Sequence, residues 1–244
     1  ISSDGTRIHY EIIGRKSAPP VLMIQGLGAD KHMWDMQRFV LATRYRVIAH
    51  DNRGAGRSDK PFGAYTIEQM AEDAISVLDH AEIDNAHVVG ASMGGVISQL
   101  VAVLYPERVR SLSLVCTSCS NHQWRRDLIK TWGDIATEKG MGAMTAVAAR
   151  WVIGPRSLRR LWPAVSWLGP ISTSRPSHGF KGQVQAILDA YAKIVTSANG
   201  QADGSVPLSA TEFSALGLSA VDTSAEVSLL NDLIDVRSGT AVDS

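Results

Sequence analysis

The pentapeptide Gly90-Ala91-Ser92-Met93-Gly94 separates two runs of different periodicity. Before it, residues 86–90 are apolar and strand-like. After it, residues 93–104 repeat apolar side chains at helical spacing and end before Pro106. The G-x-S-x-G spacing between a strand and a helix is typical of a serine held on a tight turn, with its hydroxyl above the sheet and glycines making room for the backbone. We therefore predict that Ser92 is a nucleophile.

A second glycine-rich loop, Gln25-Gly26-Leu27-Gly28, follows the strand-like run 21–24. Backbone N–H groups in such a loop and at the start of a helix can stabilise a developing oxyanion. We expect the amides of Leu27 and Met93 to form this oxyanion hole. A dinucleotide-binding loop is excluded, because the third glycine of that motif would fall at Lys31.

Strands and helices alternate on both sides of these motifs. Apolar residues repeat at three- and four-residue steps over Ile67 to Leu78, and Thr66 is a natural N-cap. Further strands are predicted at 46–49 and 109–116, and a helix around 34–41. Strands linked by helical crossovers are parallel, so we expect an α/β fold with a doubly wound, mostly parallel sheet. The runs 6–13 and 21–24 predict a β-meander at its entrance.

Four motifs together resemble the α/β-hydrolase superfamily, in particular its bacterial esterase, haloperoxidase and lactonase-like branch. They are Q-G-L-G at 25–28, D-N-R-G-A-G-R-S at 51–58, G-A-S-M-G-G at 90–95 and Y-P-E-R-V at 105–109. The resemblance covers about residues 3–119 and continues weakly beyond them. It implies hydrolysis of carboxylic esters or related acyl groups without a metal or organic cofactor, and structural roles for Asp51 and Arg53. His50 is interpreted as a strand-end residue.

Composition divides the chain into three parts. We expect an α/β-hydrolase core at 1–119, a helical cap at 120–188 and an acidic C-terminal segment at 189–244, which has eight acidic and two basic residues. From about residue 191 the sequence resembles acidic repeat modules of bacterial surface proteins, which would make this end truncated or foreign. Five tryptophans fall in the cap and are interpreted either as core residues or as an apolar roof over Ser92: Trp124, Trp132, Trp151, Trp162 and Trp167.

The catalytic triad expected from the resemblance follows the chain order serine, acid, histidine. Asp203, in a G-x-x-D-x-x-V-P-like turn, matches the acid, but no histidine follows position 178. His178 is then the remaining choice for a general base, which must come within about 3 Å of the serine oxygen. Two alternatives stay open: residual catalysis by the oxyanion hole alone, or an inactive binding and interaction protein.

The overall composition favours a small neutral ligand. With 24 basic and 24 acidic residues the net charge is zero, so neither nucleic acid nor a membrane is expected as a partner, and no run reaches the roughly 18 apolar residues of a membrane span. We expect a cytoplasmic enzyme that acts on a small ester, and homodimerisation if sheet surface is left uncovered. Cys116 and Cys119 form a C-x-x-C that we interpret as structural rather than redox-active or metal-binding.

Overall fold

The computed structural model describes residues 1–117, 123–152 and 177–190. Its centre is a five-stranded sheet in the order β1-β3-β2-β4-β5. The strands are β1 (Tyr10–Ile13), β2 (Pro20–Ile24), β3 (Arg46–His50), β4 (Ala86–Ala91) and β5 (Val109–Val115). All neighbouring pairs are parallel except β1 and β3. The predicted mostly parallel α/β sheet is confirmed.

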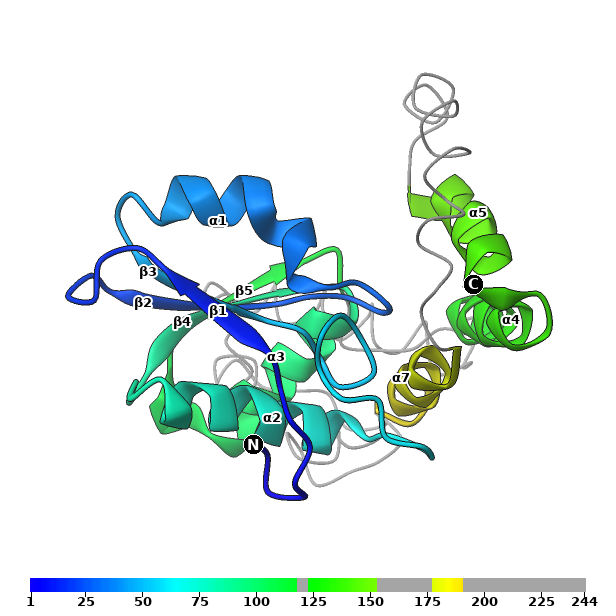
Figure 1. The fold of residues 1–244 in the computed structure, drawn as a ribbon, viewed down its shortest axis with the longest axis horizontal. Coiled ribbons are helices and arrows are strands. Elements are labelled where there is room, and N and C mark those ends of the chain that lie inside the picture. The colour runs from blue at the N-terminus through cyan, green and yellow to red at the C-terminus, as the bar shows by residue number, and fades with distance from the viewer. Residues whose placement is uncertain (118–122, 153–176, 191–244) are drawn as a thin grey trace, which may run out of the picture.

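Helices cover both faces of the sheet (Figure 1). A short 3-10 helix, η1 (Lys31–Trp34), leads into α1 (Asp35–Leu41) on one face, where Trp34 packs with Val21, Met23 and Val47. On the opposite face lie α2 (Ile67–His80) and α3 (Met93–Leu104), whose apolar sides form the larger core with Leu22, Ile24 and Val88. The sheet is therefore doubly wound, as the sequence predicts.

Helix α2 begins where its sequence pattern begins. Thr66 Oγ1 accepts a hydrogen bond from the Gln69 amide, and the Gln69 side chain accepts one from the Thr66 amide, which is a complete capping box. Met70, Ala74 and Leu78 are fully buried on the inner side of this helix. Local capping and the apolar stripe thus agree in fixing α2.

The β-meander predicted at the entrance is wrong. Strand β3 lies between β1 and β2, pairing antiparallel with the first and parallel with the second. Gly14, which follows β1, has φ +94° and packs so closely on the Tyr45 carbonyl that a Cβ would overlap it. The start of the β1–β2 connection therefore packs against the segment that leads into β3.

Three further helices gather beyond the carboxyl ends of the strands (Figure 1): α4 (Gln123–Glu138), α5 (Gly140–Val152) and α7 (Ser177–Asp189). Gly133 lies within α4, and Val184 of α7 packs against it: a Cβ at Gly133 would lie 3.2 Å from Val184 Cγ1. Gly140, at φ +83°, does mark the junction of α4 and α5. The predicted boundaries of core, cap and acidic segment stay a prediction.

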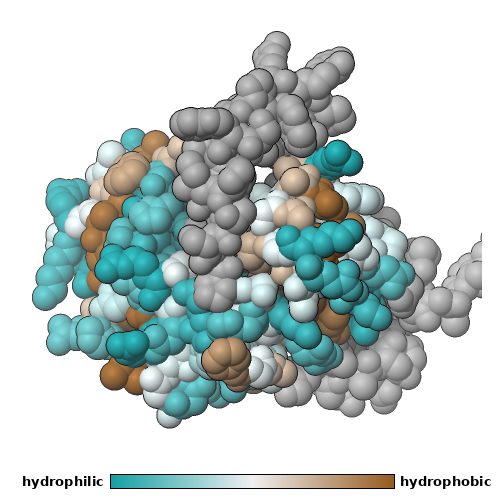
Figure 2. Space-filling model, turned by 45° about the vertical axis from the view of Figure 1, so that its right-hand side comes forward, coloured by the Kyte–Doolittle hydropathy of each residue, from teal (hydrophilic) through white to brown (hydrophobic). Residues whose placement is uncertain are grey.

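Polar residues cover most of the described surface in the view of Figure 2, and hydrophobic residues form only small groups there. Among the helices that the structure describes, none combines the length and the apolar composition that a membrane crossing requires.

Candidate active site

Ser92 occupies a sharp turn between β4 and α3. Its backbone has φ 52° and ψ −118°, a conformation that costs about 1–3 kcal/mol for a residue with a side chain. The turn is held from β5: the Ser92 amide donates to the Val115 carbonyl at 2.9 Å, and Thr117 Oγ1 donates to the Ser92 carbonyl at 2.8 Å. The Ser92 side chain is exposed. The surrounding structure thus holds this residue in a strained backbone while leaving its hydroxyl accessible.

The glycines around Ser92 are required by close backbone approach. A Cβ at Gly90 would overlap the Gly94 carbonyl and Ser98 Oγ, and a Cβ at Gly94 would overlap the Ile24 carbonyl at the end of β2. A Cβ at Gly26 would lie 3.1 Å from that of Ser92. The loop after β2 therefore passes directly beside the serine, which brings the two predicted motifs together.

The predicted oxyanion-hole residues lie on these two segments. Leu27 is in the loop after β2, and Met93 begins α3 with its side chain fully buried in the core. Within the described part of the chain, no hydrogen bond engages the backbone amide of either residue. Both donors are consequently available beside Ser92, and their role as an oxyanion hole stays a prediction.

The D-N-R-G loop at residues 51–54 supports this arrangement through buried hydrogen bonds. The Asp51 carboxylate, 1% exposed, accepts hydrogen bonds from the amides of Lys31 and Arg57 at 2.8 and 2.9 Å. Asn52 Nδ2 donates to the Gln25 carbonyl at 2.8 Å, and its Oδ1 accepts from His50 Nε2 at 3.1 Å. Complete burial lowers the pKa of His50, because desolvation disfavours the charged form of the ring.

Gln183 of α7 is a residue that sequence reasoning missed. It is fully buried, its Oε1 accepts from the Gly28 amide at 2.8 Å, and its Nε2 donates to the Arg53 carbonyl at 2.7 Å. The neighbouring Phe180 packs on Gly28, and Gly179 packs on Gly54. One side chain thus ties α7 to both loops beneath the site. Only the glutamine's place inside an otherwise apolar helix face could have indicated it.

Replacing Gln183 with Met is expected to lower the free energy of unfolding by about 2 kcal/mol, because a buried donor and a buried acceptor lose their partners. Exchange of the Gly28 amide hydrogen should become faster at the same time. Gln185→Met on the exposed side of α7 is the matched control and should change stability by about 0.5 kcal/mol or less. Denaturant titration and hydrogen exchange measure both effects, and equal stability of the two variants would contradict the tie.

A pocket of about 270 Å³ opens onto Ser92. Its lining comes from the ends of β4 and β5 and from α4, α5 and α7: Ser92, Cys116, Thr117, Trp124, Arg125, Leu128, Ile129, Trp132, Trp151 and Ile187. Three of the five tryptophans assigned to the cap region therefore border the serine, and the other two, Trp162 and Trp167, lie outside the described residues. Cys116 is a free, exposed cysteine in this lining, and its C-x-x-C partner Cys119 also lies outside them.

The residues predicted to complete a triad are not brought together with Ser92 in the described structure. Asp203 lies outside the described residues. His178, at the start of α7, hydrogen-bonds through Nε2 to the Lys60 carbonyl at 3.0 Å and stacks on Phe62 with 4.3 Å between ring centroids. It is not part of the lining of the Ser92 pocket. Its role as general base stays a prediction.

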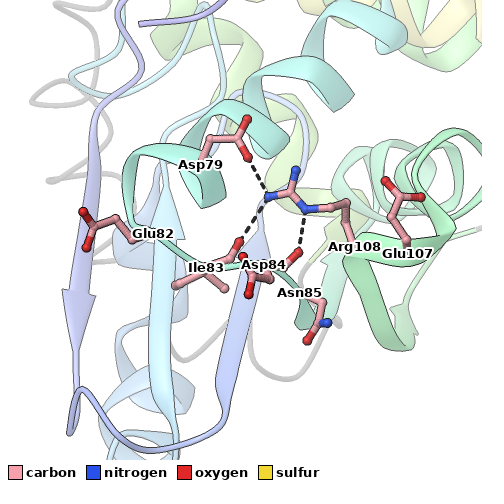
Figure 3. Close-up of a pocket in the computed structure, with 7 residues that line it drawn as sticks. All are labelled: Asp79, Glu82, Ile83, Asp84, Asn85, Glu107 and Arg108. Atoms are coloured by element: carbon pink, nitrogen blue, oxygen red, sulfur yellow. Dashed lines mark hydrogen bonds and ion pairs between the residues drawn. The ribbon is translucent and has the colours of Figure 1, made fainter.

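A second pocket, of about 460 Å³, lies at the opposite, amino end of β4 (Figure 3). Arg108 closes one side of it, donating to Asp79 Oδ1 and the Asp84 carbonyl, each at 2.6 Å, and to the Ile83 carbonyl at 3.1 Å. The guanidinium is thus occupied in joining the end of α2 to β5 through η2 (Pro106–Arg108). These contacts account for Arg108 and its partners as residues with a structural role.

A strained serine between a parallel strand and a helix, with a neighbouring glycine loop, defines the α/β-hydrolase class. Residues 19–139 match the family model described as alpha/beta hydrolase fold. Over this region the chain belongs to the α/β-hydrolase superfamily.

Three relatives illustrate the similarity. RutD of Azorhizobium caulinodans, a candidate carbamate hydrolase, is 42% identical over 108 residues, which are 44% of this chain and 40% of RutD. The 3-oxoadipate enol-lactonase 2 of Acinetobacter baylyi is 30% identical over 155 residues, 62% of this chain and 56% of that protein. The crystal structure of the enol-lactonase from Burkholderia xenovorans LB400 superposes with a TM-score of 0.72 at 28% identity, covering 81% of this chain and 75% of that one. The chain spans about half the length of the curated relatives it matches.

Proposed function

We propose that this chain acts as a serine hydrolase of small carboxylic esters and forms an acyl-enzyme on Ser92. The observation that carries the proposal is the exposed serine in a strained turn at the mouth of an apolar pocket. The hydrolase names of its relatives support the same class of reaction.

In the proposed reaction, Ser92 Oγ attacks the ester carbonyl carbon while its proton passes to a general base. The carbonyl oxygen becomes negatively charged in the tetrahedral intermediate, and the amides of Leu27 and Met93 donate hydrogen bonds to it. The intermediate collapses by breaking the bond to the alcohol, which takes up the proton. Water then cleaves the acyl-enzyme and returns Ser92. The base is predicted to be His178, oriented by Asp203.

A second candidate function is ligand binding with weak catalysis. It is favoured by the position of His178, whose Nε2 is hydrogen-bonded to a backbone carbonyl and which lies outside the Ser92 pocket lining. Without a base, the oxyanion hole alone leaves on the order of 10³–10⁴-fold acceleration over water. Association of the chain into a homodimer also stays a prediction.

Labelling with a fluorophosphonate separates the two functions. An activated serine should be phosphonylated within minutes, and fragmentation of the peptide spanning residues 88–100 should place the tag on Ser92 and leave Ser98 unmodified. Release of nitrophenol from esters of increasing acyl length gives the turnover. Protein unfolded in denaturant before labelling is the control for non-specific reaction. An unlabelled Ser92 together with no ester turnover would leave only the binding function.

A further inference from the structure

The described lining of the Ser92 pocket contains one positively charged side chain, that of Arg125. Of the described residues that line it, Arg125 alone is cationic and none is acidic, while most of the others are aromatic or aliphatic. A charge at the wall of an apolar pocket acts through a lower dielectric constant than a charge in bulk water, so its attraction for an opposite charge is stronger. The pocket therefore favours an anionic group over a neutral one at this position.

Arg125 is held in the first turn of α4 with its guanidinium over the ring of Trp124, 5.6 Å from the ring centroid. Its side chain is half-buried, and among the described residues no carboxylate pairs with it. A cation–π contact with an aromatic ring restricts the guanidinium without using its N–H groups, which lie in the plane of the guanidinium itself. Those donors remain available to a ligand.

The adjacent Arg126 has a different environment. It is exposed, lies outside the pocket lining, and donates from its guanidinium to the Leu188 carbonyl of α7 at 3.1 Å. Two neighbouring arginines of equal charge thus differ in what they contact, one facing the pocket and the other α7. They form a matched pair for experiment.

We propose that Arg125 selects substrates that carry a carboxylate at the end remote from the scissile ester. The guanidinium would hold this carboxylate with two parallel hydrogen bonds, and the tryptophans would cover the intervening carbon chain. A pocket of about 270 Å³ suits a short chain of this kind. The part of this inference that concerns turnover rests on the proposed function, whereas the binding selectivity does not.

Two esters with acyl chains of equal carbon number test the selectivity in catalysis: 4-nitrophenyl heptanoate and mono-4-nitrophenyl pimelate. The wild-type chain should show the higher kcat/KM for the pimelate. Arg125→Met should reduce the ratio of pimelate to heptanoate by roughly 10- to 100-fold, the range expected when a hydrogen-bonded ion pair is lost. Arg125→Lys should keep part of the ratio and Arg125→Glu should invert it. Arg126→Met, which removes the same net charge, should leave the ratio within about twofold.

Binding tests the selectivity without requiring turnover. The 4-nitroanilides of the same two acyl groups keep their shape and charge, resist cleavage, and quench the fluorescence of the pocket tryptophans. The pimelic anilide should bind more tightly than the heptanoic one, and only the Arg125 variants should remove the difference. Selective binding without ester turnover would support Arg125 and reject the proposed hydrolase. The assignment of Arg125 would be overturned if wild type and Arg125→Met turned over both esters with the same ratio of pimelate to heptanoate and bound the two anilides with the same selectivity.

Discussion

Ser92→Ala is expected to lower kcat for 4-nitrophenyl esters by on the order of 10³-fold or more, because the hydroxyl that forms the acyl-enzyme in the proposed reaction is lost. The folded state should keep its stability. The Ser92 side chain is exposed, and the turn is held through the Ser92 backbone by Val115 and Thr117, whose contacts alanine retains. Assays of ester hydrolysis measure kcat, and a denaturant unfolding curve for each variant measures its stability.

Ser98→Ala provides the matched control for this substitution. Ser98 lies on the same helix, α3, but is fully buried, and its Oγ donates to the Gly94 carbonyl at 2.7 Å. Removing that hydroxyl should cost about 1 kcal/mol of stability while kcat stays within a few-fold of the wild-type value. A Ser92→Ala variant that retained the turnover of Ser98→Ala would refute acyl transfer through Ser92.

Arg53→Met is expected to destabilise the fold by about 3–5 kcal/mol, the usual cost of removing one partner of a buried ion pair. Arg53 and Asp73 are 2% and 1% exposed, and the guanidinium donates to both carboxylate oxygens at 2.6 and 2.8 Å. The variant leaves the Asp73 charge without its counter-ion in the interior. The midpoint of a urea titration at neutral pH measures the loss.

Two further variants separate burial from the ion pair itself. Arg7→Met breaks a similar two-point contact with Asp59, but the Arg7 side chain is 77% exposed, so a much smaller change is expected. The double variant Arg53→Met with Asp73→Leu removes both buried charges and should recover a large part of the stability lost in Arg53→Met. If Arg53→Met and Arg7→Met shifted the midpoint equally, burial would not control the cost of losing the pair.

The elements set by local signals were predictable from the sequence. The N-cap and apolar stripe of α2 and the G-x-S-x-G turn are short-range patterns, and the structure has each of them where the sequence predicts it. The order of β1, β3 and β2 is not predictable in this way, because strand pairing is set by contacts between residues distant in the sequence, such as Tyr10 with His50. The contact of Gly133 with Val184 of α7 is not predictable for the same reason, because a glycine that admits a neighbouring helix looks, in sequence, like one that ends its own.

In the site, too, residues in local motifs were predictable and residues positioned by distant contacts were not. Ser92, Leu27 and Met93 lie in motifs that carry their own geometry, so the sequence predicts that they meet. Gln183 has no motif around it, and its importance comes from two backbone groups in separate loops. His178 was selected because no histidine follows it, a criterion that carries no spatial information, and its contacts with Lys60 and Phe62 could not be foreseen.

The two hydrogen bonds of Gln183 also determine when the loop after β2 and the D-N-R-G loop become joined to α7 as the chain folds. They join positions 155 and 130 residues apart, so forming them requires closure of very long loops, and such contacts form slowly and late. The strand-helix turn at Ser92 is held by β2, Val115 and Thr117, whereas the hydrogen bond from Gly28 to Gln183 forms only after α7 packs. A fragment that ends before α7 would thus contain every residue of the Ser92 turn and still lack the hydrogen bond that Gln183 makes with the Gly28 amide in the neighbouring loop.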